Sequence, residues 1–384
     1  MDLIYLDHNA TTALDPEAFE AMRPWFTERF GNASSAYALG HLSDGAVVAA
    51  REQVASLVGC TPAEIVFTSG GTESLNHAVR GAWEAFPAKR HLVATAVEHP
   101  AVRALVAWWR AMGGEATDVG VDGEGRLDLA ALEGAVRPDT ALVAVMAANN
   151  ESGVIFPVAE AGRIARAKGA LFLVDATQAM GKVPVDAAAW GADLLSLSGH
   201  KFHGPKGTGL LMIRRGVRLK PFMLGGSQER GRRGGTENVP GLVGLGKAAE
   251  LALARLPETE RMRALRDRFE AELAARIPDL RVHGAGTERL PNTSLVGFAG
   301  VEGEAVQLKL AEQGVCVSTG SACSTGMREP SHVLRAMQVP DAYAQGTVRF
   351  SLGRGTSDAQ IDRVLELLPG IVAALRASGL SIVK

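Results

Sequence analysis

The chain reads Leu194-Leu195-Ser196-Leu197-Ser198-Gly199-His200-Lys201-Phe202-His203-Gly204-Pro205-Lys206-Gly207, a short and largely apolar run followed by polar and turn residues. Such a run is typical of a strand buried on both faces of a sheet. A lysine that directly follows a buried strand is partly desolvated, which lowers the pKa of its amine and favours Schiff-base formation. Lys201 lies nearer the strand end than Lys206, so we expect Lys201 to react and Lys206 to be a loop lysine.

Similar runs recur upstream and alternate with helix-like segments. Continuous apolar runs occupy residues 65–67, 91–94, 142–145 and 171–174, and helical periodicity occupies residues 101–112 and 158–168. This alternation predicts an α/β doubly wound fold with a mostly parallel central sheet. The run 210–213 follows a glycine-rich turn and is expected to pair antiparallel beside the strand that ends near Ser198.

The pattern of apolar and charged residues changes near residue 255. A charged segment begins at Pro257, and Met262, Leu265, Phe269 and Leu273 share one face of a predicted long amphipathic helix. At 384 residues the chain is long for one hydrophobic core. We therefore expect a large domain over residues 15–255 and a smaller α+β domain made of residues 1–14 and 256–384.

Composition narrows the class of protein. The net charge is −2, with 47 % hydrophobic and 21 % charged residues, so the chain has no overall field that would attract nucleic acid or an acidic membrane. The longest apolar run, 141–148, is far shorter than the roughly 18 residues of a membrane span. No signal peptide is evident, and three scattered cysteines predict neither a disulfide framework nor a metal site. A cytoplasmic enzyme is expected.

A glycine-rich turn follows the first apolar run. It reads Thr68-Ser69-Gly70-Gly71-Thr72-Glu73 and leads into a predicted helix. Gly71 and its neighbour allow close backbone approach, Thr72 adds a hydroxyl, and the helix N-terminus offers free N–H groups. The segment is interpreted as a phosphate cradle, with an ordinary helix start as the alternative.

Polar residues also follow three other strands. Asp175 ends the run 171–174, and a carboxylate there needs a cationic partner, such as a protonated ring nitrogen, or serves as a structural salt bridge or helix cap. His99 and Asn150 follow the runs near residues 94 and 145. Because ligands bind at the carboxyl ends of parallel strands, these side chains are expected in one crevice. A lysine, an acidic partner for a pyridine nitrogen and a phosphate cradle together indicate pyridoxal phosphate.

The sequence resembles the cysteine desulfurases, which are fold-type I pyridoxal-phosphate enzymes of the class V aminotransferase group. The nitrogen-fixation and iron–sulfur-assembly branch is the most similar. The resemblance runs over essentially the whole chain and is carried by residues 5–12, 68–73, 97–100, 148–151, 174–178, 198–207, 233–238, 320–323 and 348–351.

The resemblance implies a role for each matching residue. Lys201 forms the Schiff base, Asp175 pairs with the pyridine nitrogen, Gln178 bonds the phenolic oxygen and His99 stacks on the ring. The phosphate is held by Gly71, Thr72, Ser198 and His200, with Thr236 from the second subunit of a homodimer. Asn150 and Arg349 bind the carboxylate of L-cysteine. The product is L-alanine, and the sulfur passes as a Cys323 persulfide to acceptor proteins such as an iron–sulfur scaffold.

Cys323 also stands out from its surroundings. It lies among small and polar residues between Ser318 and Gly326, which predicts a mobile, exposed loop. Cys316 lies in an apolar strand and is expected to be inert core, and Cys60 is expected to pack at a helix end. Catalysis is therefore assigned to Cys323, Lys201 and His99, with His99 as the proton carrier. A selenocysteine lyase, a class V aminotransferase without a catalytic cysteine, and an assembly scaffold with incidental cofactor binding remain the alternatives.

Overall fold

The computed structural model describes residues 3–319 and 330–378. A seven-stranded sheet forms its centre, in the order β2-β8-β7-β6-β5-β3-β4. The strands are β2 (Ile65–Thr68), β8 (Gly209–Ile213), β7 (Leu194–Ser198), β6 (Leu171–Asp175), β5 (Thr140–Met146), β3 (His91–Thr95) and β4 (Glu115–Val119). Strand β8 is antiparallel to both of its neighbours, and the other pairs are parallel. The predicted α/β fold with a mostly parallel sheet is confirmed, including the antiparallel pairing of β8 beside β7.

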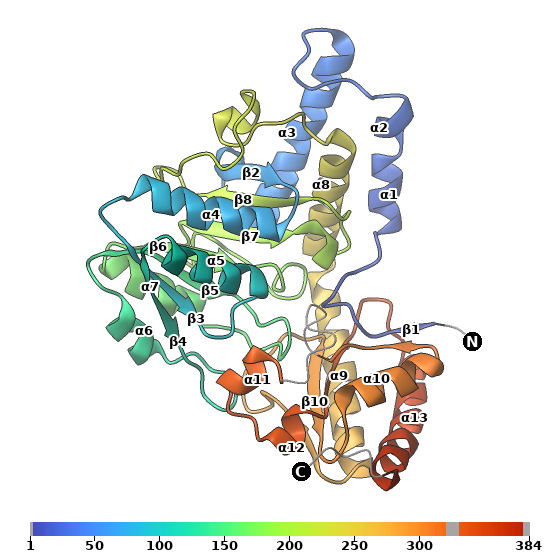
Figure 1. Ribbon diagram of the computed structural model, residues 1–384. Coiled ribbons are helices and arrows are strands. Elements are labelled where there is room, and N and C mark those ends of the chain that lie inside the picture. Colours follow the sequence, from blue (N-terminus) through green and yellow to red (C-terminus); the bar gives the residue numbers. More distant parts are fainter. Residues whose placement is uncertain (1–2, 320–329, 379–384) are drawn as a thin grey trace.

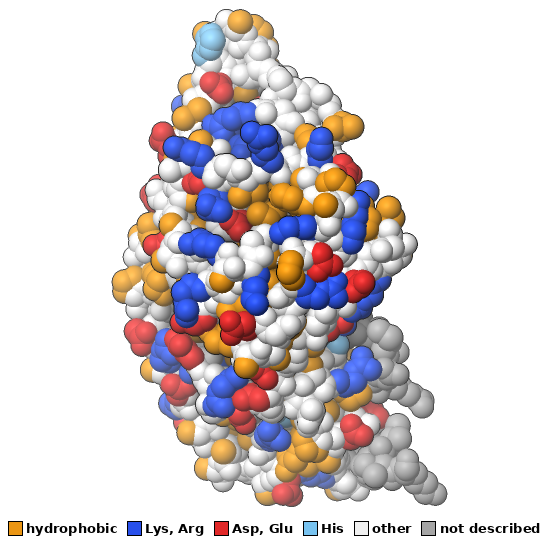
Figure 2. All heavy atoms as spheres, turned by 90° about the vertical axis from the view of Figure 1, so that its left-hand side faces the viewer, with side chains coloured by type: hydrophobic (Ala, Val, Ile, Leu, Met, Phe, Trp, Pro, Cys, Tyr) orange, Lys and Arg blue, Asp and Glu red, His pale blue; other side chains and the backbone are white. Residues whose placement is uncertain are grey.

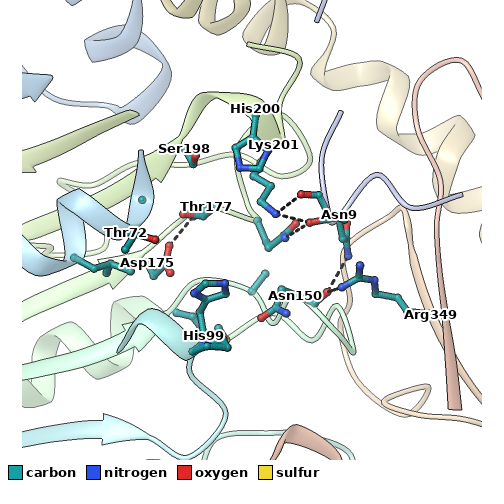
Figure 3. A pocket seen from close by; sticks show the side chains of 17 residues that line it. Asn9, Thr72, His99, Asn150, Asp175, Thr177, Ser198, His200, Lys201 and Arg349 are labelled. Atoms are coloured by element: carbon teal, nitrogen blue, oxygen red, sulfur yellow. Dashed lines mark hydrogen bonds between the residues drawn. The ribbon is translucent and has the colours of Figure 1, made fainter. Parts of the chain in front are cut away.

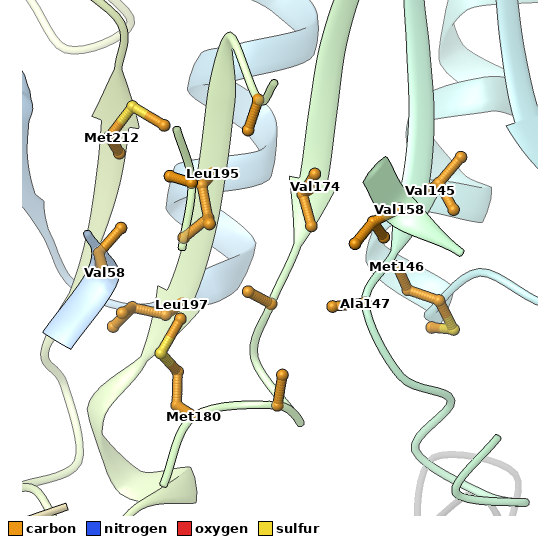
Figure 4. Packing of buried hydrophobic residues seen from close by; sticks show 14 of the residues in the cluster. Val58, Val145, Met146, Ala147, Val158, Val174, Met180, Leu195, Leu197 and Met212 are labelled. Atoms are coloured by element: carbon orange, nitrogen blue, oxygen red, sulfur yellow. The ribbon is translucent and has the colours of Figure 1, made fainter. Parts of the chain in front are cut away.

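Both faces of this sheet are apolar. Alternate residues of each strand point to opposite sides, and each side packs into its own buried cluster. Val143 packs into one buried cluster and its neighbour Leu142 into another, and Val174 and Leu173 divide in the same way. Figure 4 shows the first cluster, in which Leu195, Leu197 and Met212 lie side by side. This arrangement explains why the runs in the sequence are continuous rather than alternating.

Helices cover the two faces. The cluster that contains Leu142 is closed by α4 (Gly71–Ala85) and α5 (Pro100–Ala111). The opposite cluster receives buried residues from α3 (Ala38–Val58), α7 (Val158–Ala167) and α8 (Val239–Ala254). The smaller helices α1 (Pro16–Met22), α2 (Pro24–Thr27) and α6 (Leu129–Ala135) complete this part of the chain (Figure 1).

A second group of elements has its own sheet and core. Strand β10 (Thr293–Phe298) pairs antiparallel with β12 (Thr347–Ser351) and with β9 (Leu280–Val282). Helices α9 (Thr259–Arg276), α10 (Gly303–Glu312) and α13 (Asp358–Ala377) contribute to this core, whereas α11 (His332–Ala336) and α12 (Asp341–Ala344) place their buried residues in the cluster of the central sheet. Leu265, Phe269 and Leu273 of α9 are buried in this core, so the predicted amphipathic helix is confirmed. The proposed domain boundaries near residues 14 and 255 stay a prediction.

The N-terminal segment joins the two groups. Strand β1 (Ile4–Tyr5) pairs in parallel with β11 (Val315–Cys316), and Leu6 is buried in the C-terminal core. Figure 1 shows the chain passing from β1, beside the orange and red elements, to α1 at the other end of the molecule. Residues between β1 and α1 therefore run along the junction of the two groups.

Strand β4 at the sheet edge is polar and carries ion pairs. Asp118 pairs with Arg103 and with Arg110, and Glu115 pairs with Arg137. Figure 2 shows a face on which basic and acidic side chains are interspersed with hydrophobic ones. Charges on an edge strand disfavour pairing with a further strand. None of the helices in the described ranges combines the length and the apolarity needed to cross a bilayer.

Candidate active site

A pocket of about 280 Å³ opens at the carboxyl ends of the central strands (Figure 3). Its lining includes ten side chains or backbone positions that the sequence singled out: Gly71, Thr72, His99, Asn150, Asp175, Gln178, Ser198, His200, Lys201 and Arg349. They come from the ends of β2, β3, β5, β6 and β7 and from β12 of the other group. The convergence expected from a parallel sheet is therefore present in the structure.

Lys201 ends a short turn, Gly199–Lys201, that directly follows β7. Its Nζ donates to the backbone oxygen of Asn9 at 2.7 Å and to that of Ala10 at 2.8 Å. Lys206, the rival lysine, is exposed and does not line the pocket. The N-terminal segment thus fixes the amine of Lys201 inside the pocket.

Asn9 is a pocket residue that the sequence reasoning missed. It is 1 % exposed, and its side chain donates to Thr293 Oγ1 at 2.9 Å and accepts from Asn292 Nδ2 at 3.1 Å. Its backbone N–H donates to Ser351 Oγ at 3.0 Å. The only signal was that Asn9 lies in the recognised segment 5–12, because a single asparagine in a coil has no periodicity to reveal its burial.

The glycine-rich turn after β2 forms a concave surface at the start of α4. Gly70, the N-cap, has φ +149° and offers no side chain, so no cap side chain satisfies the backbone N–H groups of the first turn. A Cβ on Gly71 would lie 3.3 Å from Thr177 Oγ1 and 3.7 Å from Ser198 Cβ. Glycine thus keeps this space open between hydroxyl groups.

His200 lies at the same end of the pocket. Its Nδ1 is 3.0 Å from Thr11 Oγ1. Burial, followed by the charges of Lys201 and Lys206, lowers the pKa of His200 to about 4. The ring is therefore neutral at pH 7 and supplies a hydrogen-bonding nitrogen rather than a charge.

Asp175 ends β6 and is 7 % exposed. Its Oδ1 accepts the Thr177 backbone N–H at 3.1 Å. Figure 3 shows this carboxylate on the side of the pocket that also carries Thr72 and His99. A carboxylate in this position can bind a cationic ring nitrogen.

His99 precedes α5, and its Nδ1 accepts the Ala101 backbone N–H at 3.2 Å. Burial lowers the pKa of His99, against the opposing effect of Asp175 and with a further lowering by Lys201. The resting ring is therefore neutral and carries its proton on Nε2. In Figure 3 this ring lies in the pocket below Lys201.

Glu98 is a second residue to which the sequence gave no role. It is fully buried, and burial raises the pKa of its carboxyl to about 8, with a further contribution from Asp175. Its Oε1 accepts from Thr95 Oγ1 at 2.7 Å and from the Met146 backbone N–H at 2.8 Å. At neutral pH Glu98 is therefore mostly protonated.

Arg349 enters the pocket from β12 and is 2 % exposed. Its guanidinium donates to Asp7 Oδ1 at 2.6 Å and to the Asn150 backbone oxygen at 2.8 Å. A planar guanidinium at a pocket wall matches the geometry of a carboxylate ligand.

Comparison with known proteins places this geometry in a family. The model of the aminotransferase class-V family matches residues 4–364. The chain belongs to the class-V aminotransferase family. The chain is 52 % identical to a cysteine desulfurase of Trichormus azollae, over 98 % of the present chain and 94 % of that protein.

Solved structures agree with this assignment. A NifS-like protein superposes with a TM-score of 0.92 at 38 % identity, covering 97 % of the present chain and 100 % of that chain. A structure described as SspA in complex with cysteine gives a TM-score of 0.81 at 33 % identity, with 91 % and 98 % of the two chains covered.

Two predicted site residues are not part of this pocket as the structure describes it. Thr236 is not part of the 280 Å³ pocket but lines another hollow with Arg233 and Glu237. Its expected role in a second subunit is compatible with that position and stays a prediction. Cys323 lies outside the described residues.

The other two cysteines are described. Cys316 is in β11 as expected but is only half-buried, because β11 has two residues and pairs with β1 alone, so its assignment to the core was too strong. Burial raises the pKa of the Cys60 thiol to about 12, so its reactive thiolate form is scarce at neutral pH.

Proposed function

We propose that this chain is a pyridoxal-phosphate-dependent cysteine desulfurase that converts L-cysteine into L-alanine and a persulfide on Cys323. The observation that carries the proposal is one pocket that combines Lys201, Asp175, His99 and Arg349 with the glycine-rich start of α4. The relatives of about 50 % identity that are named cysteine desulfurases support it.

The pocket fits the cofactor by the chemistry of its donors. The N-terminus of α4 with Gly71, Thr72, Ser198 and His200 would hold the phosphate, and Thr236 of a second copy would complete the cradle. Asp175 would pair with the ring nitrogen, Gln178 would donate to the phenolic oxygen, and His99 would stack on the ring. Lys201 would form the covalent link. When bound, pyridoxal phosphate supplies an electron sink for negative charge at Cα of the amino acid.

The substrate is expected to bind through its carboxylate. Arg349 offers a guanidinium at the pocket wall, and Asn150 lies beside it. This anchor would leave Cα of cysteine near the amine of Lys201, which would take up the Cα proton. The neutral ring of His99 can carry a second proton only if the bond from the Ala101 N–H opens, so its proton-carrier role includes that change.

Sulfur transfer requires Cys323. Its thiolate attacks the sulfur atom of the bound cysteine, and the bond between that sulfur and Cβ breaks. The electron pair of the broken bond stays with the carbon skeleton, which takes up protons and leaves as alanine. The sulfur remains on Cys323 as a persulfide. We further propose a cytoplasmic homodimer that passes this sulfur to acceptor proteins such as an iron–sulfur scaffold.

The test is a product analysis. The purified protein, loaded with pyridoxal phosphate, is incubated with L-cysteine, and alanine and protein persulfide are measured by mass spectrometry. We expect alanine in proportion to sulfur released and a persulfide on the Cys323 peptide. Turnover of L-selenocysteine alone would favour the lyase, and transfer of the amino group to a keto acid would favour an aminotransferase.

A further inference from the structure

Lys182 is a buried amine that the mechanism above does not use. It follows β6 by seven residues and is 7 % exposed. Its Nζ donates to Gln178 Oε1 at 2.7 Å, and within residues 3–319 and 330–378 no carboxylate lies within ion-pair distance of it. Burial, followed by the charges of Lys201 and Arg349, lowers the pKa of Lys182 well below its usual value.

This contact defines which way the Gln178 amide points. Its Oε1 accepts the hydrogen bond from Lys182 Nζ, and its Nε2 donates to the backbone oxygen of Asn9 at 2.9 Å. The same oxygen accepts from Lys201 Nζ. If the amide were flipped, its Nε2–H groups would point at the amine hydrogens of Lys182. Its Oε1 would then point at the backbone oxygen of Asn9, so both hydrogen bonds would be lost. Lys182 and the Asn9 oxygen therefore select the same orientation from opposite ends.

The stability of the fold does not explain a lysine here. A buried amine without a counter-ion is destabilising relative to an apolar side chain of similar length. Lys182 and Lys201 both line a small cavity of about 30 Å³. The other ionisable groups around that cavity are His8, His203, Arg255 and Arg354, of which the two histidines have pKa values lowered to about 4, chiefly by burial. Lys182 is thus connected to the cofactor pocket by its hydrogen bond to Gln178, which lines that pocket.

We propose that Lys182 is a positioning residue of the cofactor site, which holds the Gln178 amide so that its N–H is presented to the phenolic oxygen of the bound cofactor. The inference rests on the proposed function, because it requires pyridoxal phosphate in this pocket. An N–H donated to that oxygen stabilises its negative charge. Since the oxygen shares a proton with the link to Lys201, losing the donor raises the pH at which the link loses that proton.

The test is a double-mutant cycle read by absorbance. The parent, Lys182→Met, Gln178→Ala and the double variant are loaded with cofactor, and the pH midpoint of the absorbance change of the link is measured without substrate. We expect Lys182→Met to raise the midpoint by about 0.5–1 pH unit. Gln178→Ala should raise it at least as much, and adding Lys182→Met to Gln178→Ala should give no further shift. Lys206→Met, at an exposed lysine, is the matched control and should leave the midpoint unchanged.

Two outcomes overturn the proposal: an unchanged midpoint in Lys182→Met, or shifts that add in full, since addition means an effect independent of Gln178. Thermal unfolding of the apo proteins accompanies the cycle, and Lys182→Met should be at least as stable as the parent. If that variant does not fold, Lys182→Gln replaces it, because its shorter arm cannot reach Gln178 in the same way. Borohydride reduction of the parent distinguishes failure of the proposed function from failure of the role of Lys182. If no cofactor-modified Lys201 peptide is found, the proposed function itself is wrong. If the peptide is found, the cycle tests the role of Lys182 alone.

Discussion

Lys201 and Lys206 lie five residues apart, yet their surroundings differ. The amine of Lys201 is held by two backbone oxygens of the N-terminal segment, whereas Lys206 is exposed. We expect Lys201→Ala to abolish the covalent cofactor link and Lys206→Ala to retain it. Borohydride reduction followed by peptide mapping measures this directly. A modified peptide centred on Lys206 would refute the assignment.

Asp175 has one bond that an asparagine can preserve. The Thr177 N–H could still donate to an amide oxygen at the position of Oδ1, so Asp175→Asn should fold normally. An amide does not stabilise a protonated ring nitrogen, and turnover of cysteine should fall by about 10- to 1000-fold, which corresponds to one to three pKa units of lost pairing. The measurement is alanine formation alongside a thermal melt. Alanine formation at the parent rate would show that Asp175 is structural.

Cys323→Ser separates binding from sulfur transfer. Serine is close in shape but hardly ionised at neutral pH and forms no persulfide. The variant should retain the cofactor and respond spectrally to cysteine, while persulfide labelling disappears. Cys60→Ser and Cys316→Ser are the controls and should keep the persulfide. Labelling that moved to Cys316, which is only half-buried, would contradict the mechanism.

Among the elements, the start of α4 makes the most specific demand on sequence. Gly70 has φ +149°, a conformation that disfavours any side chain. Gly70→Ala should therefore lower the free energy of unfolding by about 1–3 kcal/mol and weaken retention of the cofactor phosphate. Cofactor dissociation during dialysis and thermal melts report the two effects.

Gly45 provides a control of opposite sign. It lies exposed inside α3, and a Cβ there would meet no atom within 4 Å. Gly45→Ala should stabilise the protein by about 0.5–1 kcal/mol without altering cofactor retention. If both glycine variants lost cofactor equally, the effect would not come from the cradle.

Elements with strong patterns were predictable, and weakly patterned ones were not. The apolar runs became β2, β3, β5, β6 and β7, because burial on both faces demands continuous apolar residues. Strand β4 was not predicted because it lies at the sheet edge and reads Glu115-Ala116-Thr117-Asp118-Val119, a polar stretch whose two acidic residues form ion pairs with arginines. Strands β9, β10 and β12 form a separate antiparallel sheet, and β12 pairs with β10, a strand far back in the chain, which local periodicity cannot indicate.

For the molecule as a whole, the histidines predict loss of stability in acid. Burial is the first cause that lowers the pKa of His8, His77, His200, His203 and His283 to about 4. Between about pH 6.5 and 4 the unfolded chain binds protons at these sites that the native state does not, so the free energy of unfolding falls as the pH falls. Glu98, with its pKa raised to about 8, acts in the opposite sense.

A single variant isolates the histidine effect from that of Glu98. His283 is fully buried, and His283→Gln cannot gain a charge. Relative to the parent, this variant should lose less stability between pH 6.5 and 4, by up to about 3 kcal/mol. Urea unfolding at a series of pH values measures the difference, with exposed His41→Gln as the control. Parallel pH profiles for the parent and His283→Gln would argue against this assignment.

The site was more predictable than its supports. Strand-end residues such as Asp175 and Lys201 could be placed together because a parallel sheet brings its carboxyl ends to one edge. Three supporting residues around the pocket, Asn9, Glu98 and Lys182, are single polar residues whose burial follows from tertiary packing alone. Thr236 and Cys323 depend on a second copy and on residues outside the described ranges, so their roles remain predictions.

The contact between Asp7 and Arg349 spans 342 positions of the chain, and Asn9 bonds Ser351 across the same interval. During synthesis on the ribosome, the N-terminal segment therefore cannot form these two hydrogen bonds until most of the chain has been translated. A nascent chain that stalls before β12 has the strands of the central sheet but not the wall of the pocket that Arg349 supplies. Binding of the substrate carboxylate would then require completed translation, and truncated chains would lack the Arg349 anchor.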